Sequence, residues 1–258
     1  MKSNLRHLVH SNFKNNPALC YLPSSAVILL DEEIPFKLLM LHSLQNKPPG
    51  IKVDDPFLPP FEEGIFITDL SDSHSLVFNK FCVCDHHVIA FPKAFEHQTS
   101  PLTVADFSAA ALVIAELQAF MFFNCGPDSG MSVPHKHMQL IPYESLGGKL
   151  PIEEAYFARK AYWKDKSDPL LTIPQLQGIR LRFKELEDYR EPQQLHRCYH
   201  ELLKDLEISS SESYNLILTP RLMWVVVREK NSVISTEDPL AKVDINSLGF
   251  VGTIAVKN

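Results

Sequence analysis

The residues from His135 to Gln139 place polar side chains at alternate positions, with Lys136 and Met138 between them. In an extended strand, this spacing directs His135, His137 and Gln139 to one face. An imidazole that donates from one ring nitrogen to a carbonyl keeps a lone pair on the other, and this lone pair can attack phosphorus. We therefore interpret His137, which the other two residues flank, as the candidate nucleophile of a phosphate-transfer reaction.

A loop of small residues, from Asn124 to Val133, precedes this motif. Its glycines, proline and serines favour turns that direct several backbone N–H groups inward, where they form an anion site. The N–H groups near Gly130 to Val133 would stabilise charge on the non-bridging oxygens of a phosphate. Gln139 cannot donate a proton as a histidinium can, so the leaving group should itself be a stable anion. This favours transfer between phosphates over hydrolysis.

The same residues also allow a metal-binding interpretation and a purely structural one. A loop with glycines is often only a turn, and two histidines on a strand can be buried for packing. A zinc site needs at least three ligands, of which His135 and His137 would supply two. The spacing of the sequence selects none of the candidates for the third, which are His86, His97, Cys82, Cys84 and Cys125.

Composition and charge limit the class of protein. The chain has 258 residues, of which 45% are hydrophobic and 22% charged, as in ordinary globular proteins. Its net charge of −6 argues against a general nucleic-acid or acidic-membrane binder. Five scattered cysteines form no disulfide framework, which favours a reducing compartment, and we expect the cytoplasm. The N-terminal residues contain no long apolar run, so we expect neither a signal peptide nor a membrane span.

The elements that must position the motif are strands and one buried helix. Thr103, with Asp106 three residues later, resembles a capping box, and the apolar residues that follow predict a helix over Thr103–Phe123. This helix would lead into the small-residue loop. Further expected helices are Ile152–Trp163 and Pro192–Leu206, and the expected strands are Ala26–Leu30, Phe36–Leu41, Leu76–Phe78, Cys82–Phe91, Arg180–Phe183, Tyr214–Leu218 and Leu222–Val227.

One internal similarity suggests a duplication. The segment Ser73–Phe81 resembles Ser213–Arg221, and each is followed by a second apolar strand. Two related halves, residues 20–150 and 151–258, could then pack as an internal pseudo-dimer within a single domain of residues 1–258. Such an arrangement favours a monomer, because the second half would stand in for a partner subunit.

Several motifs together resemble one known family. His135-Lys136-His137-Met138-Gln139, with Asn124-Cys125-Gly126 and Ser129-Gly130 before it, resembles the His-x-His-x-Gln branch of the histidine-triad superfamily. The match is closest to the diadenosine tetraphosphate (Ap4A) phosphorylases, also called ATP adenylyltransferases. Motifs at Asp55–Pro60, Asn79–Phe81, Asp85–His87, Leu102-Thr103, Ser213–Leu216 and Leu248–Thr253 are similar and follow the family's order.

The resemblance implies a fold, a reaction and a set of site residues. The implied fold is α+β, with a histidine-triad-like antiparallel sheet and helices packed on it. The implied reaction is reversible phosphorolysis of Ap4A to ATP and ADP through AMP bound covalently to His137, with a possible ADP-sulfurylase side activity. The implied substrate-binding residues are Lys47, Asn79, Lys80, Asn124, Gly130, Met131, Ser132, Val133, His135, Gln139, Asn246, Ser247, Leu248, Thr253 and Lys257.

The implied partners are small molecules, namely a dinucleoside polyphosphate and orthophosphate, and neither a nucleic acid nor a membrane. No tightly bound cofactor or protein-held metal is implied, although a Mg²⁺ ion could accompany the polyphosphate. The chain departs from the family at Val133, where glutamine is frequent, and at Thr253, where a larger apolar residue is expected. Alternative functions are a histidine-triad nucleotide hydrolase, a hexose-1-phosphate uridylyltransferase, or a nucleotide-binding regulator without activity.

Overall fold

The chain folds around one eight-stranded sheet, in which every neighbouring pair of strands is antiparallel. The computed structural model describes residues 5–20, 24–31, 34–41, 55–162, 179–230, 232–234 and 242–257. In spatial order, the strands are β3 (Phe66–Asp69), β4 (His74–Phe78), β5 (Val88–Pro92), β7 (Met138–Pro142), β6 (Ala119–Cys125), β9 (Ser213–Leu218), β10 (Leu222–Arg228) and β8 (Leu181–Glu185).

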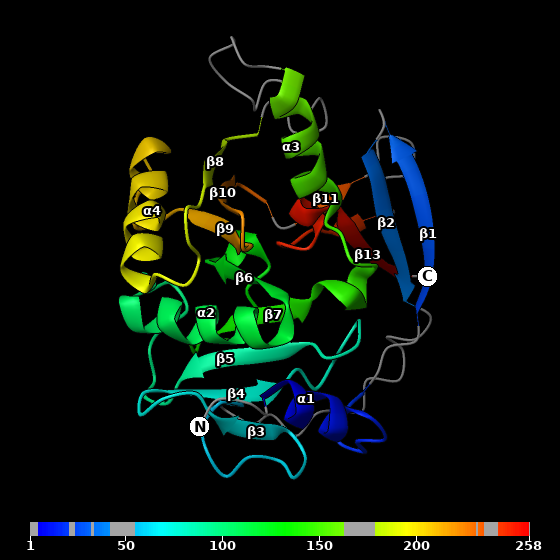
Figure 1. Cartoon of the computed structure of the whole chain (residues 1–258), viewed down its shortest axis with the longest axis vertical. Coiled ribbons are helices and arrows are strands. Elements are labelled where there is room, and N and C mark those ends of the chain that lie inside the picture. The colour runs from blue at the N-terminus through cyan, green and yellow to red at the C-terminus, as the bar shows by residue number, and fades with distance from the viewer. Residues whose placement is uncertain are drawn as a thin grey trace.

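Helices cover both faces of this sheet (Figure 1). The helices α1 (Leu5–Phe13), α2 (Val104–Leu117) and α4 (Pro192–Asp205) pack on one face, and α3 (Pro151–Tyr162) packs on the other. In β6, Met121 and Phe123 belong to the first core, whereas Phe120 and Phe122 belong to the second. A central strand buried on both faces needs apolar residues at nearly every position, and β6 supplies them everywhere except at the buried Asn124. The predicted α+β fold, with helices packed on an antiparallel sheet, is confirmed.

The predicted helix over Thr103–Phe123 is correct at its start and wrong at its end. Thr103 and Asp106 form the expected capping box, but the helix ends at Leu117. Gln118 adopts the left-handed conformation with φ of 51°, and the next residue begins β6. A long apolar run fits a buried helix and a central strand equally well, so periodicity alone could not separate the two.

A second, smaller sheet joins the two ends of the chain. The predicted strands Ala26–Leu30 and Phe36–Leu41 correspond to β1 (Ser24–Asp31) and β2 (Ile34–Leu41), which form an antiparallel hairpin. β13 (Thr253–Lys257) pairs with β2 in parallel. The short strands β11 (Ser232–Ile234) and β12 (Lys242–Asp244) form a separate pair. Among the described residues, no helix combines the length and the apolar character that crossing a bilayer requires.

The predicted strand Cys82–Phe91 is only partly correct, because β5 begins at Val88. Cys82 and Cys84 are buried in the turns before it and not in a strand. The remaining predicted elements correspond to α3, α4, β4, β8, β9 and β10, with differences of a few residues at their ends.

Candidate active site

The predicted row of polar side chains lies mostly before a strand and not within one. β7 begins at Met138, whereas His135 forms an isolated bridge with His97. The backbone N–H of Lys136 donates to the carbonyl of Glu96 over 2.7 Å, which keeps this segment extended. The side chains alternate as predicted: both histidine rings contact Phe57, and Lys136 points the opposite way into the core.

His137 has the geometry of a neutral nucleophile. Its Nδ1 atom donates to the backbone carbonyl of His135 over 2.8 Å, so the lone pair lies on Nε2. Burial is the main reason why the pKa of His137 is lowered to about 4, and the nearby His135 ring lowers it further. The ring is therefore uncharged at neutral pH and can attack without prior loss of a proton.

Gln98 fixes the backbone of the nucleophile. The N–H of His137 donates to the side-chain oxygen of Gln98 over 2.7 Å. The amide nitrogen of Gln98 donates to the carbonyls of Asn124, at 2.9 Å, and of His137, at 3.3 Å. One fully buried amide thus joins the histidine segment to the start of the small-residue loop. Sequence analysis missed Gln98, since nothing in the local sequence relates it to residues 26 and 39 positions away.

His135 is held by two acceptors. Its Nδ1 atom lies 2.7 Å from Asp55 Oδ2, and its Nε2 atom lies 2.8 Å from the carbonyl oxygen of Pro92. Only a doubly protonated ring could donate to both. Asp55 also accepts from the backbone N–H of Phe57, whose ring packs against His135 and His137. Sequence analysis noted Asp55 and Phe57 in a family motif but did not assign them to the site.

The small-residue loop presents backbone N–H groups beside the histidines. It contains a 3-10 turn (Pro127–Ser129) between two glycines with positive φ, Gly126 at 85° and Gly130 at 86°. Ser129 Oγ donates to the carbonyl of Gly126 over 2.6 Å and closes the turn. The N–H groups from Gly130 to Val133 donate to no acceptor in the described part of the chain. The binding of an anion by these N–H groups stays a prediction.

The C-terminal segment packs against this loop. A Cβ atom added to Gly130 would lie 2.9 Å from the Cβ of Asn246. The side-chain oxygen of Asn124 accepts from Ser247 Oγ at 2.6 Å and from Asn215 Nδ2 at 2.8 Å. The structure therefore brings Asn246 and Ser247 to the loop, as the resemblance implied. Asn124 is buried, and its side chain clamps β6 to β9 and to this segment.

Asn79 and Gln139 meet at His87. Asn79 Nδ2 lies 3.2 Å from the Nδ1 atom of His87, which is buried against Phe122. Burial lowers the pKa of His87 to about 4, a hydrogen bond with Gln139 opposes this shift, and the nearby His137 ring adds to it. His87 therefore connects two predicted site residues to the nucleophile.

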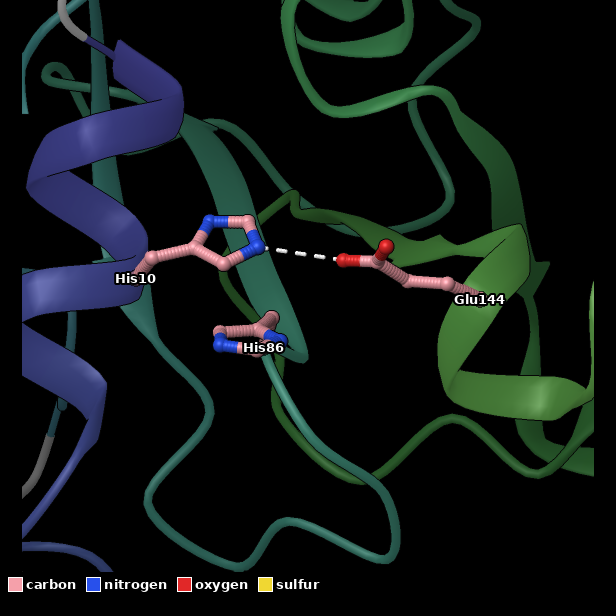
Figure 2. A group of neighbouring side chains, drawn as sticks. All are labelled: His10, His86 and Glu144. Atoms are coloured by element: carbon pink, nitrogen blue, oxygen red, sulfur yellow. Dashed lines mark hydrogen bonds and ion pairs between the residues drawn. The ribbon is translucent and has the colours of Figure 1, made fainter.

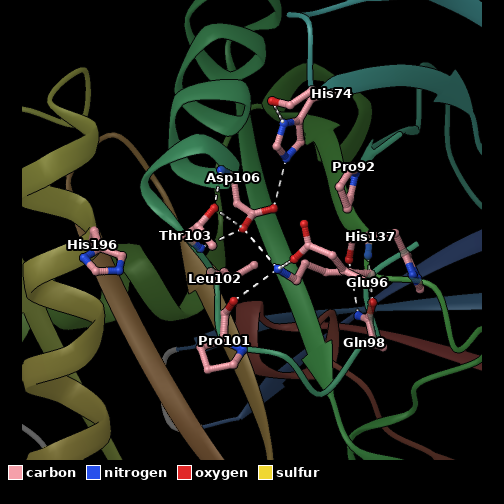
Figure 3. Close-up of polar contacts among 12 residues, drawn as sticks. His74, Pro92, Glu96, Gln98, Pro101, Leu102, Thr103, Asp106, His137 and His196 are labelled. Atoms are coloured by element: carbon pink, nitrogen blue, oxygen red, sulfur yellow. Dashed lines mark hydrogen bonds and ion pairs between the residues drawn. The ribbon is translucent and has the colours of Figure 1, made fainter. Parts of the chain in front are cut away.

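Behind the histidines, a buried network secures their position (Figure 3). Lys136 Nζ donates to the carbonyl of Pro101 at 3.1 Å, lies 3.3 Å from Asp106 Oδ2, and contacts Glu96. Asp106 also lies 3.0 Å from His74 Nε2. Burial alone would raise the pKa of Asp106, but its hydrogen bonds with His74 and the α2 capping residue outweigh it, so the pKa is lowered. The ion pair between Lys136 and Asp106 thus connects the histidine segment to the start of α2.

Other predicted site residues lie elsewhere or outside the described residues. Lys80 is partly exposed and pairs with Glu62 at 2.5 Å. Leu248 is buried in the core that α3 covers, and the N–H of Thr253, at the start of β13, donates to its carbonyl over 2.9 Å. Lys47 lies outside the described residues, as does the side chain of Lys257.

Two family profiles match the chain. The profile described as the Ap4A phosphorylase N-terminal domain matches residues 5–158. The profile described as the ATP adenylyltransferase C-terminal domain matches residues 174–258. The chain belongs to the Ap4A phosphorylase family.

Relatives of this family in Saccharomyces cerevisiae support the assignment over the full length. The chain is 28% identical to diadenosine 5',5'''-P1,P4-tetraphosphate phosphorylase 2, with 100% of the chain and 89% of that protein covered. It is 26% identical to Protein APA1, with 87% of the chain and 76% of that protein covered. The crystal structure of yeast Ap4A phosphorylase Apa2 in complex with AMP has a TM-score of 0.79 and 25% identity, with 100% of this chain and 89% of that one covered.

The structure of Apa2 in complex with Ap4A has a TM-score of 0.76 at 25% identity, with 100% of this chain and 90% of that one covered. These findings confirm the predicted class of enzyme, a nucleotidyltransferase of the Ap4A phosphorylase family.

Proposed function

We propose that this chain converts Ap4A and orthophosphate to ATP and ADP, with His137 as the nucleophile. In the first step, Nε2 of His137 attacks the α-phosphorus next to one adenosine. The Nε2–P bond forms as the P–O bond to the rest of the molecule breaks, and ATP leaves as a stable anion. The observation that carries this proposal is the free Nε2 lone pair, which the hydrogen bond from Nδ1 to the His135 carbonyl leaves in place.

In the second step, an oxygen of orthophosphate attacks the same phosphorus. The Nε2–P bond breaks, ADP is released and the neutral ring returns. The leaving group is the ATP anion in the first step and the neutral His137 ring in the second, so neither step needs a proton donor on the leaving group. The positive charge that develops on the ring during attack is stabilised by the His135 carbonyl, which already accepts from Nδ1.

The phosphate chain would bind at the small-residue loop, since the N–H groups from Gly130 to Val133 have no acceptor in the described part of the chain. Ser247 is joined to the start of this loop through Asn124, whereas Asn79 and Gln139 meet at His87, close to the nucleophile. All three side chains would contact the nucleotide. Lys80 would contact the polyphosphate, and we keep the same prediction for Lys47 and Lys257. Lys80 would then exchange its pairing with Glu62 for a phosphate oxygen.

The assay compares products with and without orthophosphate. ATP and ADP that form only when phosphate is present support phosphorolysis, whereas ATP and AMP without phosphate indicate a hydrolase. A brief exposure to Ap4A without phosphate, followed by mass spectrometry, should reveal one AMP adduct on His137. Lack of any adduct and of any turnover would support the regulator without activity.

We further propose that the chain acts as a monomer, as one domain of two related halves, on small molecules and not on nucleic acid. The large sheet runs without interruption from β3 to β8, through strands of both profile segments. The five cysteines are free, and burial raises the pKa of Cys82 and Cys125 to about 11. A set of unpaired thiols suits a reducing compartment such as the cytoplasm. Gel filtration of the purified chain tests the monomer.

A further inference from the structure

Three side chains from separate elements converge on the side of the molecule where α1 meets the large sheet (Figure 2). His10 belongs to α1, His86 precedes β5, and Glu144 belongs to the 3-10 turn Tyr143–Leu146. One ligand-type atom from each lies within 4.8 Å of the other two. Among the described residues, no other group of three or more histidines, cysteines or carboxylates meets this distance. The function proposed above uses none of the three.

The His10 ring is arranged as metal-binding histidines usually are. Its Nδ1 atom donates to the carbonyl of Arg6, one helical turn earlier, over 2.8 Å. Such a bond to a carbonyl fixes the tautomer and directs the lone pair of Nε2 outward. This Nε2 atom lies 3.0 Å from Glu144 Oε1. A lone pair and a carboxylate oxygen repel each other, so the contact requires a cation, which is either a second proton or a metal ion.

His86 is held in a strained position with an unsatisfied nitrogen. Its φ of 55° lies in the left-handed region, which residues other than glycine rarely adopt. Its ring stacks on that of His10 with centroids 4.1 Å apart, and its Nδ1 atom is buried without a hydrogen-bond partner in the described structure. A buried nitrogen without a partner points to a missing ligand.

The charges around the cluster allow one cation. Glu144 supplies a negative charge and Asp85, next to His86, supplies another that acts on that ring. Arg6 opposes them, with Nη2 3.6 Å from Glu144 Oε2. Two imidazoles and a carboxylate suit zinc and similar transition metals, whereas Mg²⁺ and Ca²⁺ prefer oxygen ligands alone.

We propose that His10, His86 and Glu144 bind a divalent transition-metal ion of the zinc type. Ligand atoms of tetrahedral zinc lie about 3.4 Å apart, so the pair of His10 and Glu144 already has a suitable spacing. The His86 ring must turn out of its stack to bring a nitrogen to the ion. The bound ion would fasten α1 to the turn before β5 and to the 3-10 turn after β7. His86 directly precedes His87, so the fastened turn is the one that supports the Asn79 and Gln139 side of the site.

A second pair of histidines makes a matched control. His196 and His200 lie four residues apart on α4, with their Nε2 atoms 3.0 Å apart, and such a pair can bind zinc weakly without a third ligand. The full chain is stripped with a chelator and titrated with Zn²⁺, with Co²⁺ as a spectroscopic substitute. The variants are His86→Asn, in which asparagine tolerates the positive φ, Glu144→Gln and His200→Gln.

We expect the wild type and His200→Gln to bind one Zn²⁺ with the same dissociation constant and to melt at a higher temperature when it is bound. His86→Asn and Glu144→Gln should each weaken binding by more than about tenfold, because even the outer contacts of a metal ligand contribute that much. Circular dichroism of the metal-free variants shows whether each one folds, and Glu144, at the surface, provides a second test if His86→Asn does not. Zn²⁺ binding that survives both substitutions, binding that only His200→Gln removes, or an absence of binding in the wild type would each overturn the proposal.

Discussion

The Nδ1 atom of His137 lies 2.8 Å from the backbone carbonyl oxygen of His135, and this contact determines which ring nitrogen can react. The acceptor belongs to a residue two positions earlier, so the tautomer is set by the backbone of the motif itself. No carboxylate is needed to orient the nucleophile, and the Asp55 carboxylate is directed to His135 instead.

Replacement of His137 by alanine should reduce phosphorolysis of Ap4A by roughly four orders of magnitude or more, as loss of other covalent nucleophiles does. The AMP adduct should disappear as well. His200→Ala, which removes an exposed histidine of α4, is the control and should keep full activity. Activity that persists in His137→Ala would assign the nucleophile to another residue.

The rate of adduct formation should decrease with falling pH only near pH 4 and not near pH 6.5. Burial lowers the pKa of His137 to about 4, so the ring stays neutral as the pH falls from 7 to 5 and is protonated only near 4. Ap4A has no terminal phosphate, so its phosphate chain takes up no proton near pH 6.5 and cannot cause a decrease in rate there. Single-turnover formation of the adduct, measured by rapid quenching between pH 4 and 8, tests this.

The same shift affects stability. An unfolded histidine takes up a proton near pH 6.5, whereas the folded ring does so only near pH 4, so the unfolded state binds more protons between these values. The contribution of the neutral ring to stability is complete above pH 6.5 and is lost as the pH falls toward 4.

A rate of adduct formation that falls at pH 6.5, in protein that circular dichroism shows to be folded, would contradict the buried neutral ring.

Lys136→Met should destabilise the fold by about 3–5 kcal/mol, since it leaves a buried carboxylate, that of Asp106, without its cation. Unfolding in urea measures this loss. The matched control is Lys149→Met, which removes an exposed lysine that lies 3.7 Å from Glu154 and should change stability little. Equal stability of the two variants would mean that the network behind the histidines does not secure them.

Gly130→Ala should raise the KM for Ap4A, and this effect should exceed what its backbone strain alone would cause. The backbone of residue 130 has a φ of 86°, and the new Cβ would lie 2.9 Å from the Cβ of Asn246. The loop and the C-terminal segment must therefore separate. Gly147→Ala is the control: its φ is 91°, but no atom lies within 4 Å of the new Cβ. Both variants bear backbone strain of about 1–3 kcal/mol, and only Gly130→Ala should alter KM. A similar KM in both variants would exclude the loop from substrate binding.

Local patterns in the sequence predicted the features that depend on interactions between residues close together in the chain. Thr103 and Asp106 identified the start of α2, and alternation identified His135 and His137 as neighbours on one face. The end of α2 could not be located in the same way, because Ala119 to Phe123 are apolar whether the segment is helical or extended. Only the position of this segment at the centre of the sheet makes it a strand.

The site residues that sequence analysis missed act across long separations. Asp55 reaches His135 over 80 positions and Gln98 reaches His137 over 39, and no spacing within a motif encodes such contacts. His86 and His87 illustrate the same limit. The sequence placed both residues in one family motif and offered His86 as one of several candidate zinc ligands, but it did not indicate their neighbours His10 and Asn79, which come from elements that only the fold brings together.

The pairing of β6 with β9 joins the segment matched by the first profile to the segment matched by the second. If either segment were made alone, one edge of its β6 or β9 strand would have no hydrogen-bonded neighbour. Asn124 would also lose its hydrogen bonds with Asn215 and Ser247. The two pieces, coexpressed as separate polypeptides, should therefore find each other and restore activity, while each by itself should aggregate.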